Sequence, residues 1–161
     1  MRLTPGRLIS GSFDLWLPGG NAVGSQTRFF SPTADTTLTI PSTARSAITV
    51  GAYDPRLSSY ASFSGRGYTR ILHEIKPDLA APGVNIPAPR SGGGYASFTG
   101  TSFATPFVSG SAALMMEWGI LRGNDPFLYG EKLKAYLIAG AKPIASESEY
   151  PNRRVGWGRL V

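Results

Sequence analysis

Residues 100–106 read Gly-Thr-Ser-Phe-Ala-Thr-Pro, and this stretch decides the fold. It places Ser102 at the start of an apolar helix predicted to run from about Ser102 to Trp118. Pro106 is tolerated only near a helix N-terminus, where backbone donors have no intrahelical partner, so the helix must begin within one turn of Ser102. Because apolar residues occur nearly all round it, we predict that this helix is buried.

Ser102 is the candidate nucleophile. The free N–H groups and positive dipole end of a helix N-terminus would stabilise an oxyanion on a carbonyl attacked by Ser102 Oγ. Gly100 would let a substrate backbone approach, and Ala104 leaves room above the first turn. The alternative is an N-cap serine that only satisfies backbone donors, which is the commoner role for a serine before an apolar helix.

Short apolar segments on both sides of this helix predict a parallel sheet. Residues 46–52, Ser-Ala-Ile-Thr-Val-Gly-Ala, are typical of a strand buried on both faces. Residues 77–83 predict a short strand stopped by Pro-Gly, and residues 155–161 alternate as a strand does. Residues 91–94, Ser-Gly-Gly-Gly, predict a turn. The fold class is therefore α/β.

A second helix is predicted between Asp125 and Gly140. Asp125 would be its N-cap, Pro126 its first helical residue and Gly140 its stop signal. Glu131 is expected to face Lys134 one turn later. The apolar face of this helix would consist of Leu133, Tyr136 and Leu137.

Residues 1–39 carry short apolar runs, such as Leu8-Ile9 and residues 13–17, separated by Gly and Pro. Such runs are typical of strands and turns, so we predict a β-rich segment here. No catalytic candidate lies in it. An incomplete sheet edge would leave Trp16, Phe29 and Phe30 poorly covered.

The serine motif resembles that of the subtilisin-like serine peptidases, the subtilases, and Val108 and Gly110 follow it in the expected places. Further similar segments extend the resemblance over residues 39–161; they are residues 40–41, 48–52, 63–67, 76–83 and 156–161. The resemblance implies that residues 40–161 form the C-terminal part of a subtilisin-like α/β domain with a parallel sheet. It also implies a serine endopeptidase acting on peptides or proteins, with Ser102 as nucleophile and backbone oxyanion donor. Thr101 would supply a hydroxyl behind the site.

Three short stretches, residues 13–18, 122–125 and 150–154, resemble subtilases of the clostridial germination-protease type. This narrower resemblance implies a jelly-roll domain inserted ahead of the serine region, with residues 1–39 as its last strands. The family resemblance also predicts a cis bond between Ile40 and Pro41, because the matching proline follows a residue at the wall of the substrate pocket.

The Asp and His that complete a subtilase triad, and the oxyanion Asn, are not found in matching motifs in this chain. His73 is the only histidine and is expected at the surface. Asp78 belongs to the Lys-Pro-Asp segment and is expected to be a structural, hydrogen-bonded carboxylate. We therefore expect the chain by itself to be inactive. The alternatives are a non-catalytic partner that completes a separate N-terminal subtilase chain, and a binding module for a peptide or polyanion.

Composition excludes several other classes. A hydrophobic fraction of 42% argues against disorder, and the absence of cysteine excludes disulfides and thiolate chemistry. The 16 Lys and Arg and 10 Asp and Glu are spread along the chain, so the net charge of +6 does not favour nucleic acid. No membrane-spanning run or export signal is recognised, and no metal or other cofactor is expected.

Overall fold

The computed structural model describes residue 6 and residues 14–18, 20–24 and 26–161. The chain forms two units, Met1–Thr33 and Ala34–Val161. The first contains the short helix α1 (Gly20–Val23) and, among its described residues, no strand. The strands predicted there are thus not found where the chain is described, and Leu8-Ile9 lies outside the described residues. A strand needs a hydrogen-bonded neighbour, and no described segment pairs with this one.

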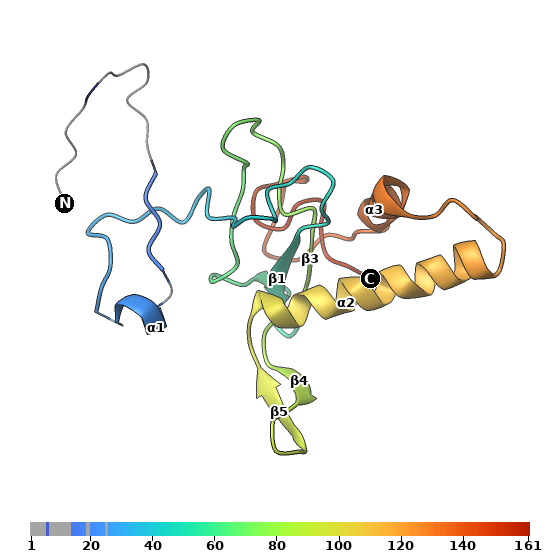
Figure 1. The fold of residues 1–161 in the computed structure, drawn as a ribbon, viewed down its shortest axis with the longest axis horizontal. Coiled ribbons are helices and arrows are strands. Elements are labelled where there is room, and N and C mark those ends of the chain that lie inside the picture. The colour runs from blue at the N-terminus through green and yellow to red at the C-terminus, as the bar shows by residue number, and fades with distance from the viewer. Residues whose placement is uncertain (1–5, 7–13, 19, 25) are drawn as a thin grey trace. The chain divides into compact units, whose positions relative to one another are not determined.

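The second unit is built on a three-stranded sheet with β1 (Val50–Asp54) at its centre. Strand β3 (Leu79–Pro82) runs parallel to β1 in the register Val50 to Leu79, and the short β2 (Ser59–Tyr60) runs antiparallel on the other side. The predicted parallel pair is therefore confirmed, with both strands slightly displaced from the expected ranges. Figure 1 shows β1 and β3 side by side beneath the loops.

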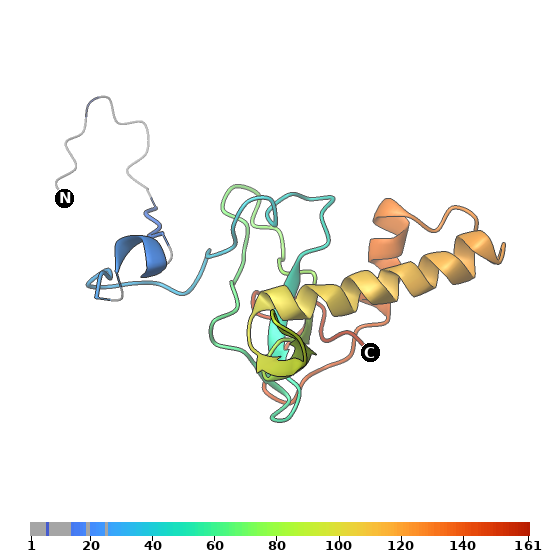
Figure 2. The same cartoon turned by 60° about the horizontal axis from the view of Figure 1, so that its bottom comes forward.

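Helix α2 (Thr101–Met116) crosses the sheet and continues as a π-helical turn, η1 (Glu117–Leu121). Figure 2 shows this long helix crossing the strands near its N-terminal end. Its Ala104 and Val108 pack in one core cluster with Ala52, Leu79 and Ala81. The helix is where the sequence predicted it, but the prediction that it is buried is wrong. Only Ala104 and Val108 are buried in α2, because the described sheet covers one side of the helix only.

A β-hairpin precedes α2 in the chain. The hairpin of β4 (Ile86–Pro89) and β5 (Tyr95–Phe98) was not predicted, although the turn at residues 91–94 was and is confirmed. The hairpin projects from the sheet and leads directly into α2 (Figure 1). Gly100 joins the two, and its N–H donates to the Gly83 carbonyl at 2.8 Å.

Helix α3 (Gly130–Ala139) begins later than predicted and ends as predicted at Gly140. Residues 125–128 instead form a turn in which Leu128 N–H donates to the Asp125 carbonyl at 3.1 Å, and Leu128 is fully buried. The predicted pair of Glu131 with Lys134 does not form. Lys134 Nζ lies 2.8 Å from Asp78 Oδ1, because a buried carboxylate binds an ammonium more strongly than an exposed one.

The closing segment is not the regular strand that its alternation predicted. It makes only isolated bridges: Arg159 pairs with Ala80 and with Lys142, and Gly156 pairs with Asn152. Gly156 and Gly158 adopt φ values of 59° and 131°, which turn the backbone and interrupt a ladder beside β3. Among the described residues, no helix is long and apolar enough to cross a membrane.

Candidate active site

Ser102 is the second residue of α2, in its first turn, and its side chain is exposed. This confirms the predicted position. The local sequence explains it: Gly83 lets the end of β3 approach both β1 and the residue before α2. A Cβ on Gly83 would lie 2.6 Å from Ala52 Cβ and 3.1 Å from the Gly100 carbonyl oxygen.

The start of α2 offers unpaired donors beside the serine hydroxyl. Within the described part of the chain, the N–H groups of Thr101 and Ser102 have no hydrogen-bond acceptor, and Ser102 Oγ has no partner. Ser102 is thus not acting as an N-cap, the commoner alternative, since α2 has no side-chain cap hydrogen bond. A free hydroxyl beside free N–H groups suits a nucleophile with its own oxyanion donor.

A cavity of about 760 Å³ opens beside this serine. Its walls are the loop of residues 39–49, the loop of residues 62–65 and the first turn of α2, with Thr101, Ser102 and Thr105 on the helix side. Thr101 is half-buried there, and its carbonyl accepts a hydrogen bond from Thr105 Oγ1 at 3.1 Å. None of the described residues lining the cavity is charged or is a histidine. The cavity therefore supplies no general base for Ser102.

The other polar residues near these segments, His73, Asn85 and Asp78, do not line this cavity. His73 is exposed, as expected, in a turn where its N–H donates to the Thr69 carbonyl. Asn85 is also exposed, and its N–H donates to Thr99 Oγ1 at 3.0 Å. Asp78 is buried just before β3, and it is hydrogen-bonded and structural, as expected. Among the described residues, no group of three or more His, Cys, Asp or Glu side chains could hold a metal ion.

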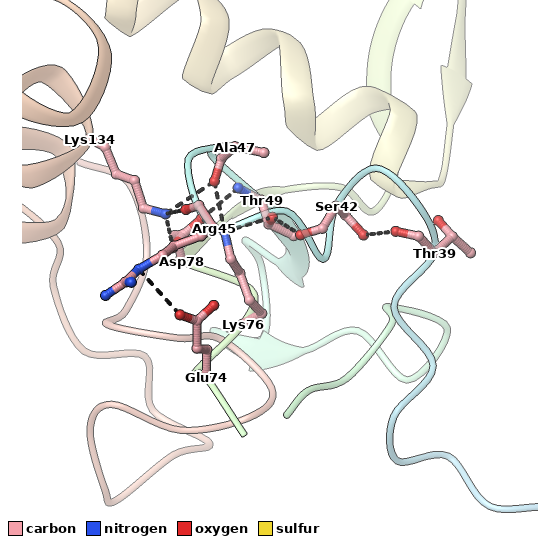
Figure 3. A network of polar contacts seen from close by, with 9 residues as sticks. All are labelled: Thr39, Ser42, Arg45, Ala47, Thr49, Glu74, Lys76, Asp78 and Lys134. Atoms are coloured by element: carbon pink, nitrogen blue, oxygen red, sulfur yellow. Dashed lines mark hydrogen bonds and ion pairs between the residues drawn. The ribbon is translucent and has the colours of Figure 1, made fainter. Parts of the chain in front are cut away.

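Asp78 is the centre of a buried ion cluster close to the cavity wall (Figure 3). Its Oδ2 lies 2.8 Å from Lys76 Nζ, and its Oδ1 lies 2.8 Å from Lys134 Nζ. Burial lowers the pKa of Lys76 below its usual value, although the hydrogen bond that Lys76 donates to Asp78 opposes this. Alternation in an extended chain places Lys76 and Asp78 on the same side, so the sequence could have suggested that pair. It carries no local signal for Lys134, which arrives from α3.

The motif around Ser102 and the sheet beneath it are shared with known proteins. The profile of the Subtilase family matches residues 19–158. The chain belongs to the subtilase family. The Ile40–Pro41 peptide bond, predicted from the same resemblance, is cis.

Two curated relatives show how this subtilase chain compares with longer proteins. The chain is 38% identical to serine protease AprX of Bacillus subtilis over 124 residues, which are 65% of this chain and 26% of AprX. It is 39% identical to subtilisin BL of Lederbergia lenta over 113 residues, which are 70% of this chain and 37% of that protein.

Among solved structures, the chain is similar to the CspB protease of Clostridium perfringens, with 48% identity and a TM-score of 0.79. The match covers 83% of this chain and 28% of the CspB chain. The prenylagaramide maturation protease PagA is also similar, with 32% identity, a TM-score of 0.61, and coverage of 80% of this chain and 44% of PagA. The chain thus spans less than half of the length of each of these relatives.

Proposed function

We propose that this chain supplies the nucleophile of a subtilisin-like serine endopeptidase, with Ser102 in that role. The observation that carries the proposal is the free Ser102 hydroxyl in the first turn of α2, at the edge of an uncharged cavity. Ser102 Oγ attacks a peptide carbonyl, and the Ser102 N–H donates to the oxyanion that forms. A histidine accepts the serine proton and returns it to the leaving amine, and water hydrolyses the acyl-enzyme.

We propose further that this reaction needs an Asp and a His from an N-terminal subtilase segment. No described residue at the cavity can serve as base, and a serine hydroxyl without a base is a weak nucleophile at neutral pH. The substrate is a peptide or protein. The similarity to the CspB protease supports placing the chain with subtilases of the clostridial germination-protease type.

An active-serine fluorophosphonate probe tests the proposal. The chain alone is expected to remain unlabelled and to hydrolyse no peptide. When it is combined with the part of the CspB protease that precedes the matched region, labelling and hydrolysis should appear, and Ser102→Ala should abolish both. Strong labelling of the chain alone, lost in Ser102→Ala, would show that a group within this chain activates the serine.

The second candidate function is a non-catalytic partner that completes a subtilase fold. The open face of α2 and η1 favours it, because the exposed Phe107 and Leu114 of α2 and Trp118 of η1 offer an apolar surface for another segment. The mixture of this chain with the CspB segment distinguishes the endopeptidase from the non-catalytic partner. A stable complex without Ser102-dependent labelling would support the non-catalytic partner and contradict the endopeptidase.

A further inference from the structure

The wall of the cavity opposite α2 is a loop without regular structure. Residues 39–49 contain turns and bends but no helix or strand pairing up to β1. Six of these residues line the cavity beside Ser102; they are Thr39, Pro41, Ser42, Ala47, Ile48 and Thr49. A loop of this kind has few backbone hydrogen bonds of its own to fix its position. What holds it therefore decides the shape of the cavity.

The buried ion cluster holds this loop through its backbone (Figure 3). Lys134 Nζ donates to the carbonyls of Arg45 at 2.8 Å and Ala47 at 3.1 Å. Lys76 Nζ donates to the Ala47 carbonyl at 2.7 Å, so two ammonium groups share one carbonyl oxygen. Asp78 Oδ2 accepts the N–H of Thr49 at 2.7 Å.

Thr49 extends the hydrogen bonds of the cluster along the loop toward the cavity. Its hydroxyl lies 3.2 Å from Lys76 Nζ and donates to the Ser42 carbonyl at 2.5 Å. The Ser42 hydroxyl in turn donates to the Thr39 carbonyl. A continuous series of hydrogen bonds thus connects the cluster to the residues on either side of Pro41.

Charge balance explains why the cluster needs the loop. Two ammonium groups face one carboxylate, and the side-chain exposures are 2% for Lys76, 5% for Asp78 and 16% for Lys134. A surplus positive charge in such a site must be compensated by hydrogen-bond acceptors. The carbonyl groups of Arg45 and Ala47 are those acceptors. Displacing the loop would therefore leave buried ammonium groups without hydrogen-bond acceptors.

We infer that Lys134 is a positioning residue, which fixes residues 39–49 as the cavity wall beside Ser102. It acts from α3 through Asp78 and the loop carbonyls and touches neither Ser102 nor the cavity. As far as substrate binding is concerned, the inference rests on the proposed endopeptidase function. In the assembled peptidase, loss of Lys134 weakens substrate binding and leaves the chemical step intact.

Hydrogen exchange of the full chain tests the structural part without any need for activity. In Lys134→Met, backbone amides of residues 44–49 should exchange about tenfold faster or more, because charged hydrogen bonds to the loop are lost. Amides of β1, β3 and α3 should exchange as in the wild type. Lys132→Met is the matched control, since Lys132 lies on the same helix, binds Asp125 at 2.6 Å and makes no contact with the loop.

Lys134→Gln is a milder second variant if Lys134→Met does not fold. Its amide can still donate to one acceptor, so the same amides should respond with a smaller change. Unchanged exchange in residues 44–49 of a folded Lys134 variant would overturn the inference, whatever the chain's function. So would equal acceleration throughout the sheet and α3, which would indicate a general loss of stability.

Kinetics of the chain combined with the N-terminal CspB segment test the functional part. Lys134→Met should raise KM about tenfold and leave kcat within about twofold, because binding alone is weakened. A fall in kcat with KM unchanged would overturn the role in substrate binding. If the wild-type mixture hydrolyses nothing, the proposed function fails, while the exchange experiment still decides whether Lys134 holds the loop.

Discussion

Ser102 and Asp78 are both polar, but their surroundings differ completely. Ser102 is exposed, and within the described part of the chain its hydroxyl has no hydrogen-bond partner, so it contributes little to stability and is free to react. Asp78 is 3% exposed and binds two lysines and a backbone N–H. Asp78 therefore stabilises the fold, whereas Ser102 is the nucleophile that we propose.

The role of Asp78 predicts a large stability loss in Asp78→Asn. The substitution removes the negative charge between Lys76 and Lys134, and leaves surplus positive charge buried without compensation. We expect a loss of about 3–5 kcal/mol in the free energy of unfolding, measured by urea denaturation. Asp125→Asn is the control, because the partner of Asp125, Lys132, is 47% exposed, so this substitution should lower the free energy of unfolding far less than Asp78→Asn does. Equal effects of the two substitutions would contradict the structural role.

At the level of elements, the sequence predicted what local patterns determine. The start of α2 follows from Gly100 and Pro106, and the parallel pair of β1 and β3 follows from two short apolar runs. It could not predict the start of α3, because the turn after Asp125 depends on burial of Leu128 in the core. Nor could it predict the partner of Lys134, since Asp78 comes from a distant segment.

The junction of β1, β3 and α2 depends on close contact at Gly83. Gly83→Ala should destabilise the chain by about 1–3 kcal/mol, since the new methyl group would overlap Ala52 Cβ. Gly110→Ala is a matched substitution inside α2, where an added Cβ meets nothing within 4 Å. It should stabilise the chain by about 0.5–1 kcal/mol, because alanine favours a helix over glycine. Chemical denaturation of both variants measures the difference, and a neutral Gly83→Ala would show that the junction can relax.

The whole molecule combines an ordered site with a large uncovered apolar surface. The exposed residues of α2 and η1 include Leu114 at 68%, Trp118 at 49% and Leu121 at 81%. The family resemblance predicted part of this, because it implied that the segments bearing the Asp and His lie outside the chain. Composition and periodicity alone could not predict this exposed surface, since an apolar helix is expected to be buried. The chain spans 28% of the similar CspB chain, so a further subtilase segment is the partner that we propose for this surface.

This surface predicts that the purified chain self-associates. An exposed apolar helix face of this kind is buried either by a complementary segment or by another copy of the chain. Leu114→Glu should reduce the self-association without lowering stability, because the side chain is exposed. Leu57→Glu is the control, since Leu57 is 73% exposed but lies in the turn between β1 and β2.

Light scattering coupled to size exclusion, over a range of concentrations, measures the effect. The wild type and Leu57→Glu should show mass rising with concentration, and Leu114→Glu should remain closer to the monomer mass. Adding the N-terminal CspB segment should lower self-association of the wild type, because the same apolar surface is then covered. A wild-type chain that is monomeric at every concentration and unfolds cooperatively would contradict the prediction. It would also favour the binding module over the incomplete peptidase, because a stable monomer would need no further segment to cover α2.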